Sequence, residues 1–383
     1  MRGREPDMKA PKGPNRSARI LVAMSGGVDS SVAAALLVEG GYEVIGATMK
    51  TFCYGENPGP SKTCCGLDGI LDARAVADRL GIPHYVFDVE EEFTRDVVDD
   101  FVSEYARGRT PNPCVRCNSN TKFRDLIRRG EALGCDGIAT GHYVRITHEG
   151  AGGESQLIRG TDAEKDQAYF LWGLPPDLLP LLHFPLGSLT KPEVRAHARS
   201  LGLRTAEKPE SQEICFVPAG DYRDLLSRRL ATEHPALLPG DLVTSSGEVV
   251  GRHDGYAGYT VGQRKGLGGG FAEPHFVLEV RPETREVVVG PREELYSSGM
   301  WVEDLNWLTR RSPVRGEEVG VQIRHRAPAV AGVIAETAAG LEIHFREPQR
   351  AVTPGQSAAV FRGARLLGGG RIARAVLPGP IPA

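Results

Sequence analysis

The first part of the chain alternates short apolar runs with stretches of helical length. The runs predict buried parallel strands, and the stretches between them predict helices that end at glycine or proline. The predicted strands are 18–25, 42–50, 84–89 and 135–144, and the predicted helices are 32–41, 67–80, 90–108 and 122–134. Strands that alternate with helices favour an α/β fold with a doubly wound parallel sheet.

The pattern changes after residue 144. A helix is predicted over 188–203, where Thr190 and Glu193 form a capping box with Pro192 in the first turn. From about residue 238, short alternating strands with turn residues between them predict β-rich structure. We therefore expect a disordered tail (1–17), a catalytic domain (18–225), a small central β-rich linker domain (226–290) and a C-terminal β-barrel (291–383).

The composition of the chain restricts the class of protein but does not indicate a particular function. A chain of 383 residues exceeds one ordinary core, and 40% hydrophobic with 25% charged residues is typical of a soluble globular protein. We find no apolar run of about 18 residues and no secretory signal, so we expect a cytoplasmic protein without a membrane span. In that compartment the seven cysteines should stay reduced.

Charge is unevenly distributed. The net charge is −3, but residues 291–383 hold 12 Arg, no Lys and 9 acidic residues, a local excess of +3. Arginine binds phosphate through a planar fork and stays charged, so this segment fits a surface that faces a polyanion. It equally fits a solubilising surface, and charge alone leaves both readings open.

The sequence SGGVDS, residues 25–30, follows the first predicted strand and opens a helix. Glycines let backbone N–H groups approach phosphate oxygens, Ser25, Ser30 and Ser31 add hydroxyls, and Asp29 would hold Mg²⁺ or orient the loop. The stretch lacks the lysine of a Walker A loop and is not Gly-x-Gly-x-x-Gly. We favour a phosphate site over a merely capped turn.

Cys114 and Cys117 form the only Cys-x-x-Cys pair of the chain, and we expect the pair to lie in a turn before the helix 122–134. The spacing fits half of a zinc site, a redox disulfide, an iron–sulfur ligand pair, or a nucleophile beside a chance neighbour. No second such pair or histidine pair at zinc spacing is present, which weakens the zinc reading. Cys215, in a short apolar stretch, reads equally well as a buried core cysteine. The adjacent Cys64 and Cys65 suggest no particular role.

SGGVDS resembles the pyrophosphate loop (PP-loop) signature of ATP pyrophosphatases. Further stretches extend the resemblance to bacterial tRNA-specific 2-thiouridylases over nearly the whole chain after residue 18. They are TPNPCVRCN, ATGHY, KDQAYFL, SQEICFVP, GYTVGQRKGLG and AVTPGQSAAVF. The resemblance implies that ATP, with Mg²⁺, adenylates the C2 oxygen of the wobble uridine (position 34) of tRNA. A persulfide sulfur then replaces that oxygen, giving 2-thiouridine, AMP and pyrophosphate.

The resemblance also implies a role for each matched residue. Cys215 would carry the persulfide, Cys117 would be the nucleophile, and the two would also form a disulfide. The implied ATP-binding residues are Ala23, Met24, Ser25, Gly26, Gly27, Val28, Asp29, Ser30, Met49 and Gly141. The implied tRNA-binding residues are Asn112, Pro113, Cys114, His142, Lys165, Asp166, Gln167, Arg324, His325 and Gln356. A cysteine desulfurase or relay protein would donate the sulfur to a monomeric enzyme.

The chain departs from the family at Cys114, where many members carry Asp. An ordinary thiol has a pKa of about 8.5 and an ordinary Asp about 3.9, so a general base is not carried over to this position. Cys114, Cys117 and Cys215 would alternatively ligate a [4Fe-4S] cluster, as in related tRNA thiolation enzymes. Competing functions are a PP-loop ligase for a small molecule and a non-catalytic RNA-binding protein. The cysteine motifs argue against the first, and the intact loop argues against the second.

Overall fold

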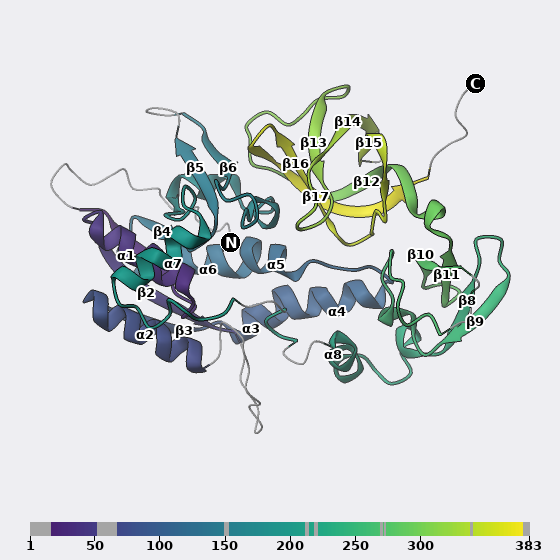
Figure 1. Ribbon diagram of the computed structural model, residues 1–383, viewed down its shortest axis with the longest axis horizontal. Helices are drawn as coiled ribbons and strands as arrows, with labels where there is room; N and C mark the ends of the chain where they lie inside the picture. The colour runs from purple at the N-terminus through teal and green to yellow at the C-terminus, as the bar shows by residue number, and fades with distance from the viewer. Residues whose placement is uncertain are drawn as a thin grey trace, which may run out of the picture.

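The computed structural model describes residues 17–51, 67–148, 153–210, 214–217, 221–268, 271, 273–337 and 340–377. Figure 1 shows a parallel α/β layer, a small sheet at the opposite end, and a barrel above the helices that lie between them. Cys64, Cys65 and the expected tail, except residue 17, lie outside the described residues. Within the described residues, no helix is both long and apolar enough to span a bilayer.

The first sheet contains five parallel strands in the order β3-β2-β1-β4-β7. The strands are β1 (Arg19–Ala23), β2 (Glu43–Lys50), β3 (His84–Asp88), β4 (Gly137–Ala139) and β7 (Leu182–His183). Their helices are α1 (Val28–Glu39), α2 (Leu67–Leu80), α6 (Phe123–Ala132) and α7 (Lys191–Ser200). In β1, Ile20 and Val22 share a core with α1, α2 and α7, whereas Leu21 packs in the core that contains α6. The predicted doubly wound sheet is confirmed.

The strand order places a ligand site. The chain leaves β1 on one side to form β2 and β3, and it returns on the other side of β1 as β4. The loops after β1 and β4 therefore diverge, and a crevice opens at the carboxyl ends of these two strands. The loop after β1 is the SGGVDS stretch, and the loop after β4 begins at Thr140.

The predicted strand 135–144 is wrong as a single element. Only β4 lies in the first sheet, and β5 (Val144–His148) instead pairs with β6 (Ser155–Arg159). This hairpin joins the C-terminal barrel, because Ile158 of β6 pairs with Arg365 of β17. Residues 137–139 and 143–144 are apolar or small with only three residues between them, so periodicity alone does not reveal that the chain turns out of the sheet at residues 140–143.

The segments before and after the Cys-x-x-Cys pair are helical with π-helical insertions. The predicted helix 90–108 is α3 (Glu90–Phe93), a π-helical turn η1 (Thr94–Val98) and α4 (Asp99–Ala106). The pair was expected in a turn, but it lies in α5 (Pro113–Arg116) and η2 (Cys117–Lys122), which lead directly into α6. Asn112 caps α5 by accepting from the backbone N–H of Cys114 at 3.2 Å, and Pro113 occupies a first-turn position. Asn-Pro reads as a turn signal, which explains the error.

The capping box of α7 is confirmed. The Glu193 carboxylate accepts from the Thr190 backbone N–H at 2.7 Å, and both halves of the box are present. The remaining helix is α8 (Tyr222–Arg229). The 3₁₀ turns are η3 (Ala168–Phe170), η4 (Pro176–Leu181), η5 (Pro235–Leu237), η6 (Tyr256–Gly258) and η7 (Arg292–Leu295).

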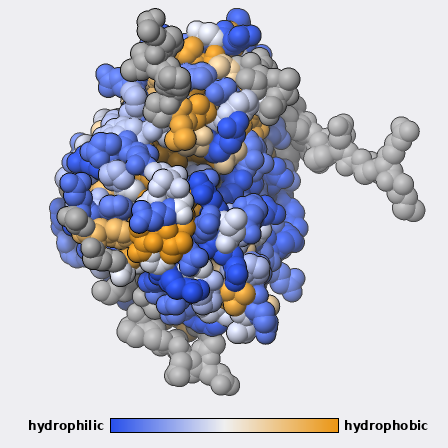
Figure 2. All heavy atoms as spheres, turned by 90° about the vertical axis from the view of Figure 1, so that its right-hand side faces the viewer, coloured by the Kyte–Doolittle hydropathy of each residue, from blue (hydrophilic) through white to orange (hydrophobic). Residues whose placement is uncertain are grey.

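The central sheet has the order β10-β11-β8-β9. Its strands are β8 (Gly240–Val243), β9 (Val249–His253), β10 (Phe276–Arg281) and β11 (Glu286–Gly290). Phe101 and Tyr105 of α4 are buried in the same cluster as Leu242 and Val287, so α4 spans from the first domain to this sheet. Figure 2 shows this end of the molecule, where hydrophilic side chains cover most of the face and apolar ones form small groups.

The C-terminal strands form the expected barrel. Their order is β12-β15-β14-β13-β16-β17, and the pairing of β12 with β17 closes the sheet. The strands are β12 (Tyr296–Trp307), β13 (Glu318–Gln322), β14 (Val330–Thr337), β15 (Gly340–Arg350), β16 (Ser357–Arg362) and β17 (Arg365–Val376). Closure removes the exposed edges of the sheet, and the interior is filled by apolar side chains such as Met300, Ile343 and Val360.

Candidate functional site

The SGGVDS loop makes a tight turn between β1 and α1. The Ser25 backbone N–H donates to Ser30 Oγ at 3.1 Å, which closes the turn over the first residues of the helix. Gly26 has a φ of +70°, and a Cβ there would lie 2.1 Å from the carbonyl oxygen of Gly69 in α2. Only glycine meets both conditions, so the loop can turn against α2 and lead into the N-terminus of α1, where helix N–H groups attract an anion.

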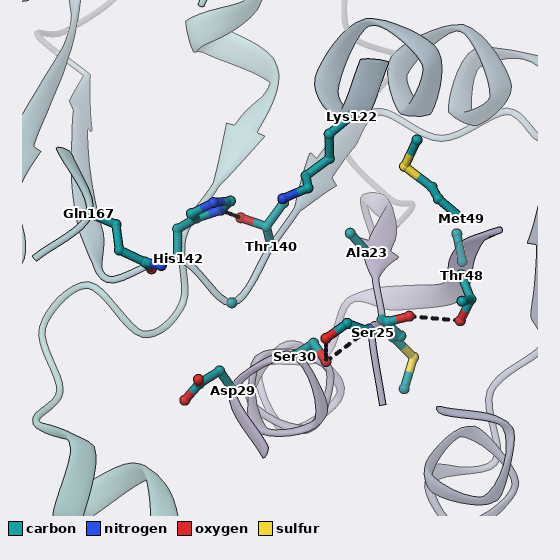
Figure 3. A pocket seen from close by; sticks show the side chains of 13 residues that line it. Ala23, Ser25, Asp29, Ser30, Thr48, Met49, Lys122, Thr140, His142 and Gln167 are labelled. Atoms are coloured by element: carbon teal, nitrogen blue, oxygen red, sulfur yellow. Dashed lines mark hydrogen bonds between the residues drawn. The ribbon is translucent and has the colours of Figure 1, made fainter. Parts of the chain in front are cut away.

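A pocket of ≈ 210 Å³ lies at the divergence of the loops after β1 and β4. Figure 3 shows the SGGVDS side chains on one side of it and His142 and Lys122 on the other. The lining residues are Ala23, Met24, Ser25, Asp29, Ser30, Ala47, Thr48, Met49, Lys122, Thr140, Gly141, His142 and Gln167. Seven of the ten residues expected to bind ATP are among them.

The other three expected ATP residues support the loop instead of lining the pocket. The Val28 side chain is 3% exposed and belongs to the apolar core under α1. Gly27 is the N-cap of α1, and its carbonyl oxygen accepts from the hydroxyls of Ser30 and Ser31 at 3.2 and 2.8 Å. Gly26 permits the turn itself. These residues shape the backbone that the lining side chains share.

Gly141 and His142 bring the loop after β4 onto the SGGVDS loop. A Cβ at Gly141 would lie 2.8 Å from the backbone of Asp29 and Ser30, so glycine is required for this approach. His142 is 9% exposed, with Nδ1 at 2.6 Å from Thr140 Oγ1. Burial, with a smaller contribution from the Lys122 charge, holds the pKa of His142 well below its ordinary value. The imidazole is therefore neutral at pH 7.

Gln167 connects this pocket to a second expected motif. Its side-chain oxygen accepts from the Tyr143 backbone N–H at 3.0 Å. The backbone N–H of Gln167 donates to the Tyr143 carbonyl oxygen at 3.2 Å. His142 and Gln167, both expected to contact tRNA, thus line the same pocket as Ser25 and Asp29, expected to contact ATP. The structure brings the two expected ligand sites together in one pocket.

Asp29 lies in a charged network that the sequence analysis missed. Lys191 Nζ donates to both Asp29 carboxylate oxygens at 2.8 Å, and the Tyr143 hydroxyl donates to one of them at 2.7 Å. Lys191 is the first residue of α7 and is only 7% exposed. Lys208 Nζ also donates to the carbonyl oxygen of Gly26 at 2.9 Å. Lys191 follows the capping-box threonine directly, but that stretch was interpreted only as a helix start.

Glu210 links Lys191 to Lys165, one of the residues expected to bind tRNA. Its two carboxylate oxygens lie 2.9 Å from the Nζ atoms of Lys191 and Lys165. Burial raises the pKa of Glu210, but hydrogen bonds from the two ammonium groups outweigh it and lower the pKa to about 2. The carboxylate stays ionised and holds both lysines on the Asp29 side of the pocket.

The cysteine motifs meet on one small apolar cluster. Cys117 and Cys215 both pack against the cluster of Phe93, Val97 and Val98. Segments far apart in sequence therefore bring both cysteines onto one cluster. The disulfide between them stays a prediction. Cys114 is exposed on α5.

The three-cysteine cluster does not fit this arrangement. Within the residues that the structure describes, no three His, Cys, Asp or Glu side chains gather closely enough to hold a metal ion. A [4Fe-4S] cluster ligated by three protein thiolates needs Cys114, Cys117 and Cys215 to converge. We therefore assign no step to such a cluster.

Because the three cysteines do not gather as a ligand set, the structure predicts the iron content of the purified protein. Purified without oxygen, the wild type is expected to contain no more iron or acid-labile sulfide than the Cys114→Asp variant, because no ligand set is assembled in either. Iron and sulfide assays with visible absorption spectra make the comparison. About four irons per wild-type chain, lost in Cys114→Asp, would contradict the arrangement seen here.

Of the remaining residues expected to bind tRNA, several connect the barrel to the first domain. The Gln356 amide donates to the carbonyl oxygen of Thr110 at 2.8 Å, next to the Asn112 cap. The His325 ring lies 4.5 Å from the Phe170 ring, between centroids. Arg324 donates within the barrel, to the carbonyl oxygen of Arg350 at 2.7 Å. The other two contacts place Gln356 beside the TPNPCVRCN motif and His325 beside the KDQAYFL motif.

The Asp166 side chain forms hydrogen bonds within the protein. Its carboxylate accepts from Arg159 at 2.5 Å and from the Gly160 backbone N–H at 2.9 Å. Arg159 in turn lies over the Phe361 ring at 3.7 Å and donates to Gln322 at 2.8 Å, both in the barrel. Asp166 therefore orients Arg159, which contacts the barrel, and its expected contact with tRNA stays a prediction.

The fold and pocket define a class of protein. A parallel sheet that leads through Ser-Gly-Gly-x-Asp-Ser into a helix, with a pocket at its switch point, defines a PP-loop nucleotide-binding protein. Residues 18–219 match the tRNA methyl transferase HUP domain family. Residues 224–291 match the tRNA methyl transferase PRC-barrel domain, and residues 297–372 match the aminomethyltransferase beta-barrel domain.

Curated relatives then identify the family. The tRNA-specific 2-thiouridylase MnmA of Carboxydothermus hydrogenoformans is 49% identical over 92% of this chain and 97% of its own length. The proteins of the same name from Geobacter metallireducens and Thermus thermophilus are each 50% identical. These cover 94% and 93% of this chain, and 98% and 95% of their own lengths. The chain belongs to the tRNA-specific 2-thiouridylase family.

Proposed function

We propose that this protein is an ATP-dependent tRNA-uridine 2-sulfurtransferase that converts the wobble uridine, position 34, to 2-thiouridine. One observation carries the proposal: the SGGVDS loop shares one pocket with His142 and Gln167. ATP bound at the loop would place its α-phosphorus beside a base held by these two residues. Chemistry on a base requires that base to leave its stack, and a pocket of this kind receives it.

In the first step, the C2 oxygen of the uridine attacks the α-phosphorus of ATP, and pyrophosphate leaves. Backbone N–H groups of the loop and the α1 N-terminus would hold the phosphates. Lys191 would neutralise charge on the leaving pyrophosphate, because its buried ammonium already lies against the loop. Asp29 would then be available to hold the Mg²⁺ that accompanies ATP.

In the second step, the terminal sulfur of a Cys215 persulfide attacks C2. The Cys117 thiolate attacks Sγ of Cys215, the sulfur–sulfur bond of the persulfide breaks, and AMP leaves with the former C2 oxygen. The products are 2-thiouridine and a Cys117–Cys215 disulfide, which a thiol reductant must reduce before the next turnover. The shared apolar cluster under both cysteines supports this pairing.

The persulfide has to come from outside the chain. We propose a cysteine desulfurase or a relay protein as donor, and we expect a cytoplasmic enzyme that acts as a monomer. The domain division proposed from sequence assigns the catalytic steps to 18–225 and tRNA contacts in part to the barrel, 291–383. The further residues that we propose for tRNA binding are Asn112, Pro113, Cys114, Lys165, Asp166, Arg324, His325 and Gln356.

Pyrophosphate release provides the direct test. Release from ATP is expected to require unmodified tRNA and to stop when the tRNA is digested with ribonuclease, because the attacking oxygen belongs to the RNA. Radiolabelled ATP and nucleoside analysis would follow pyrophosphate and 2-thiouridine together. A PP-loop ligase for a small molecule predicts the opposite result, namely release at full rate without RNA.

A further inference from the structure

A charged cavity separates the first domain from the barrel beside the turn that carries Cys117. Its volume is ≈ 650 Å³, and it is lined by charged side chains of α4, α5, β12 and β17. Figure 1 shows the barrel lying over α4 and α5, the elements that form the floor of this junction. The proposed chemistry makes no use of these charges, so their purpose is a separate question.

Arg371 of β17 is the anchor of this junction. Its side chain is 9% exposed, and one of its nitrogens donates to both Asp100 carboxylate oxygens at 2.9 and 3.1 Å. The other terminal nitrogen lies 2.8 Å from Glu104, which is 2% exposed. Burial lowers the pKa of Arg371, but the two carboxylates raise it by more. The barrel is therefore held on α4 by a permanently charged, buried ion pair.

Arg116 connects the same cluster to the nucleophile. It is the last residue of α5, directly before Cys117. One terminal nitrogen donates to Asp304 of β12 at 3.0 Å, and its Nε lies 3.5 Å from Asp100. Asp100 is thus shared between Arg116 and Arg371. The turn that presents Cys117 is held from two sides, by α4 and by the barrel.

Asp304, which accepts from Arg116, has an unusual backbone conformation. Its φ is +50°, in the left-handed region that few residues other than Gly, Asn and Asp adopt. It lies in an irregular stretch of β12, between Glu303 and Asn306, where the pairing register with β17 shifts. Glycine would adopt this backbone without cost, yet the chain places a carboxylate there, against Arg116. Strain of this kind persists where a side chain has a specific task.

We propose that Asp304 is a positioning residue for sulfur transfer: through Arg116, the barrel sets the orientation of the helical turn that presents Cys117. This inference rests on the proposed function, because it assumes that Cys117 is the nucleophile. It gives the barrel a part in the chemistry beyond holding RNA. Asp304 acts through Arg116 and touches no reacting atom.

The test uses substitutions that separate backbone strain from charge. Asp304→Gly relieves the strain but removes the carboxylate, and Asp304→Asn keeps an oxygen that accepts from Arg116. Arg285→Gly is the matched control, because Arg285 has a φ of +58° in the turn between β10 and β11. Each full-length variant is assayed for melting temperature, tRNA-dependent pyrophosphate release and single-turnover thiolation at saturating tRNA. Mass spectrometry follows alkylation of Cys117 by iodoacetamide in each variant and in the wild type under the same conditions.

We expect Asp304→Gly to keep its melting temperature and pyrophosphate release while single-turnover thiolation falls about 10- to 100-fold, the cost of a misplaced reacting group. The alkylation rate of Cys117 in Asp304→Gly should differ from that in the wild type. Asp304→Asn should recover part of the thiolation, and Arg285→Gly should match the wild type. Wild-type thiolation in Asp304→Gly overturns the inference, as does a loss that merely follows a lower melting temperature. If the wild type itself makes no 2-thiouridine, the proposed function fails, and the Cys117 alkylation rate still decides the positioning claim.

Discussion

Replacing Cys117 or Cys215 with serine is expected to lower 2-thiouridine formation at least about a thousand-fold, because loss of a covalent participant removes its whole pathway. Without Cys215 no persulfide forms, and without Cys117 the sulfur–sulfur bond is not broken. ATP binding and tRNA-dependent pyrophosphate release should survive, since neither cysteine lines the pocket among the described residues. Nucleoside analysis of the tRNA and a pyrophosphate assay measure the two steps separately.

Cys135→Ser is the matched control for these variants. Cys135 is a half-buried thiol whose pKa is raised to about 11, chiefly by burial, so it has little thiolate at pH 7 and no expected part in the reaction. Its serine variant should thiolate tRNA at the wild-type rate. Retention of 2-thiouridine in tRNA treated with either Cys117→Ser or Cys215→Ser would refute the assignment of that residue.

Neutralising the charged pair beside the loop is expected to stop the first step. Asp29→Ala and Lys191→Met should each reduce tRNA-dependent pyrophosphate release about 10²- to 10³-fold, the usual cost of one preorganised electrostatic contact. Binding of tRNA should persist in both, because the pair serves ATP. The pyrophosphate assay and a filter-binding measurement with labelled tRNA make the two readings.

Two further variants sharpen this prediction. Lys50→Met is the control, because Lys50 forms a partly exposed ion pair with Asp88 at 2.8 Å and does not line the described pocket. The double variant Asp29→Ala with Lys191→Met should lose more activity than either single variant if Lys191 contacts phosphate itself. A double variant no worse than Asp29→Ala would show that Lys191 only holds Asp29. Unchanged release in Asp29→Ala would contradict the phosphate site.

Local sequence patterns predicted most strands and helices of the first domain correctly, and each of the errors has a physical cause. Apolar runs bounded by glycine located β1, β2 and α1, because a buried parallel strand and a capped helix each have a local signature. The run 135–144 failed because its two halves belong to different sheets. The helical register of the Cys-x-x-Cys pair was missed because the Asn112 cap overrides the turn preference of Asn-Pro.

The residues of the site likewise fall into those that local sequence patterns predicted and those that they did not. The SGGVDS loop was identified from sequence, since strand, glycines and helix start are contiguous. Lys191 was missed because its ion pair with Asp29 joins segments well over a hundred residues apart, and Glu210 was missed because its role depends on Lys191; no local pattern records such contacts. Asp304 was missed for a further reason. Its significance lies in a backbone angle and in an arginine of another domain.

By itself, the sequence determined the class of fold and the PP-loop, because each depends on residues close together in the chain, and its motifs pointed to the two cysteines that we propose as reactive. Only the tertiary structure decided which thiols share a surface, that His142 is buried and neutral, and that Lys191 faces the loop. It also showed that Asp304 of the barrel accepts a hydrogen bond from Arg116, the residue directly before Cys117. Burial, charge pairing and backbone strain arise from the approach of distant segments, and they exist only once the chain has folded.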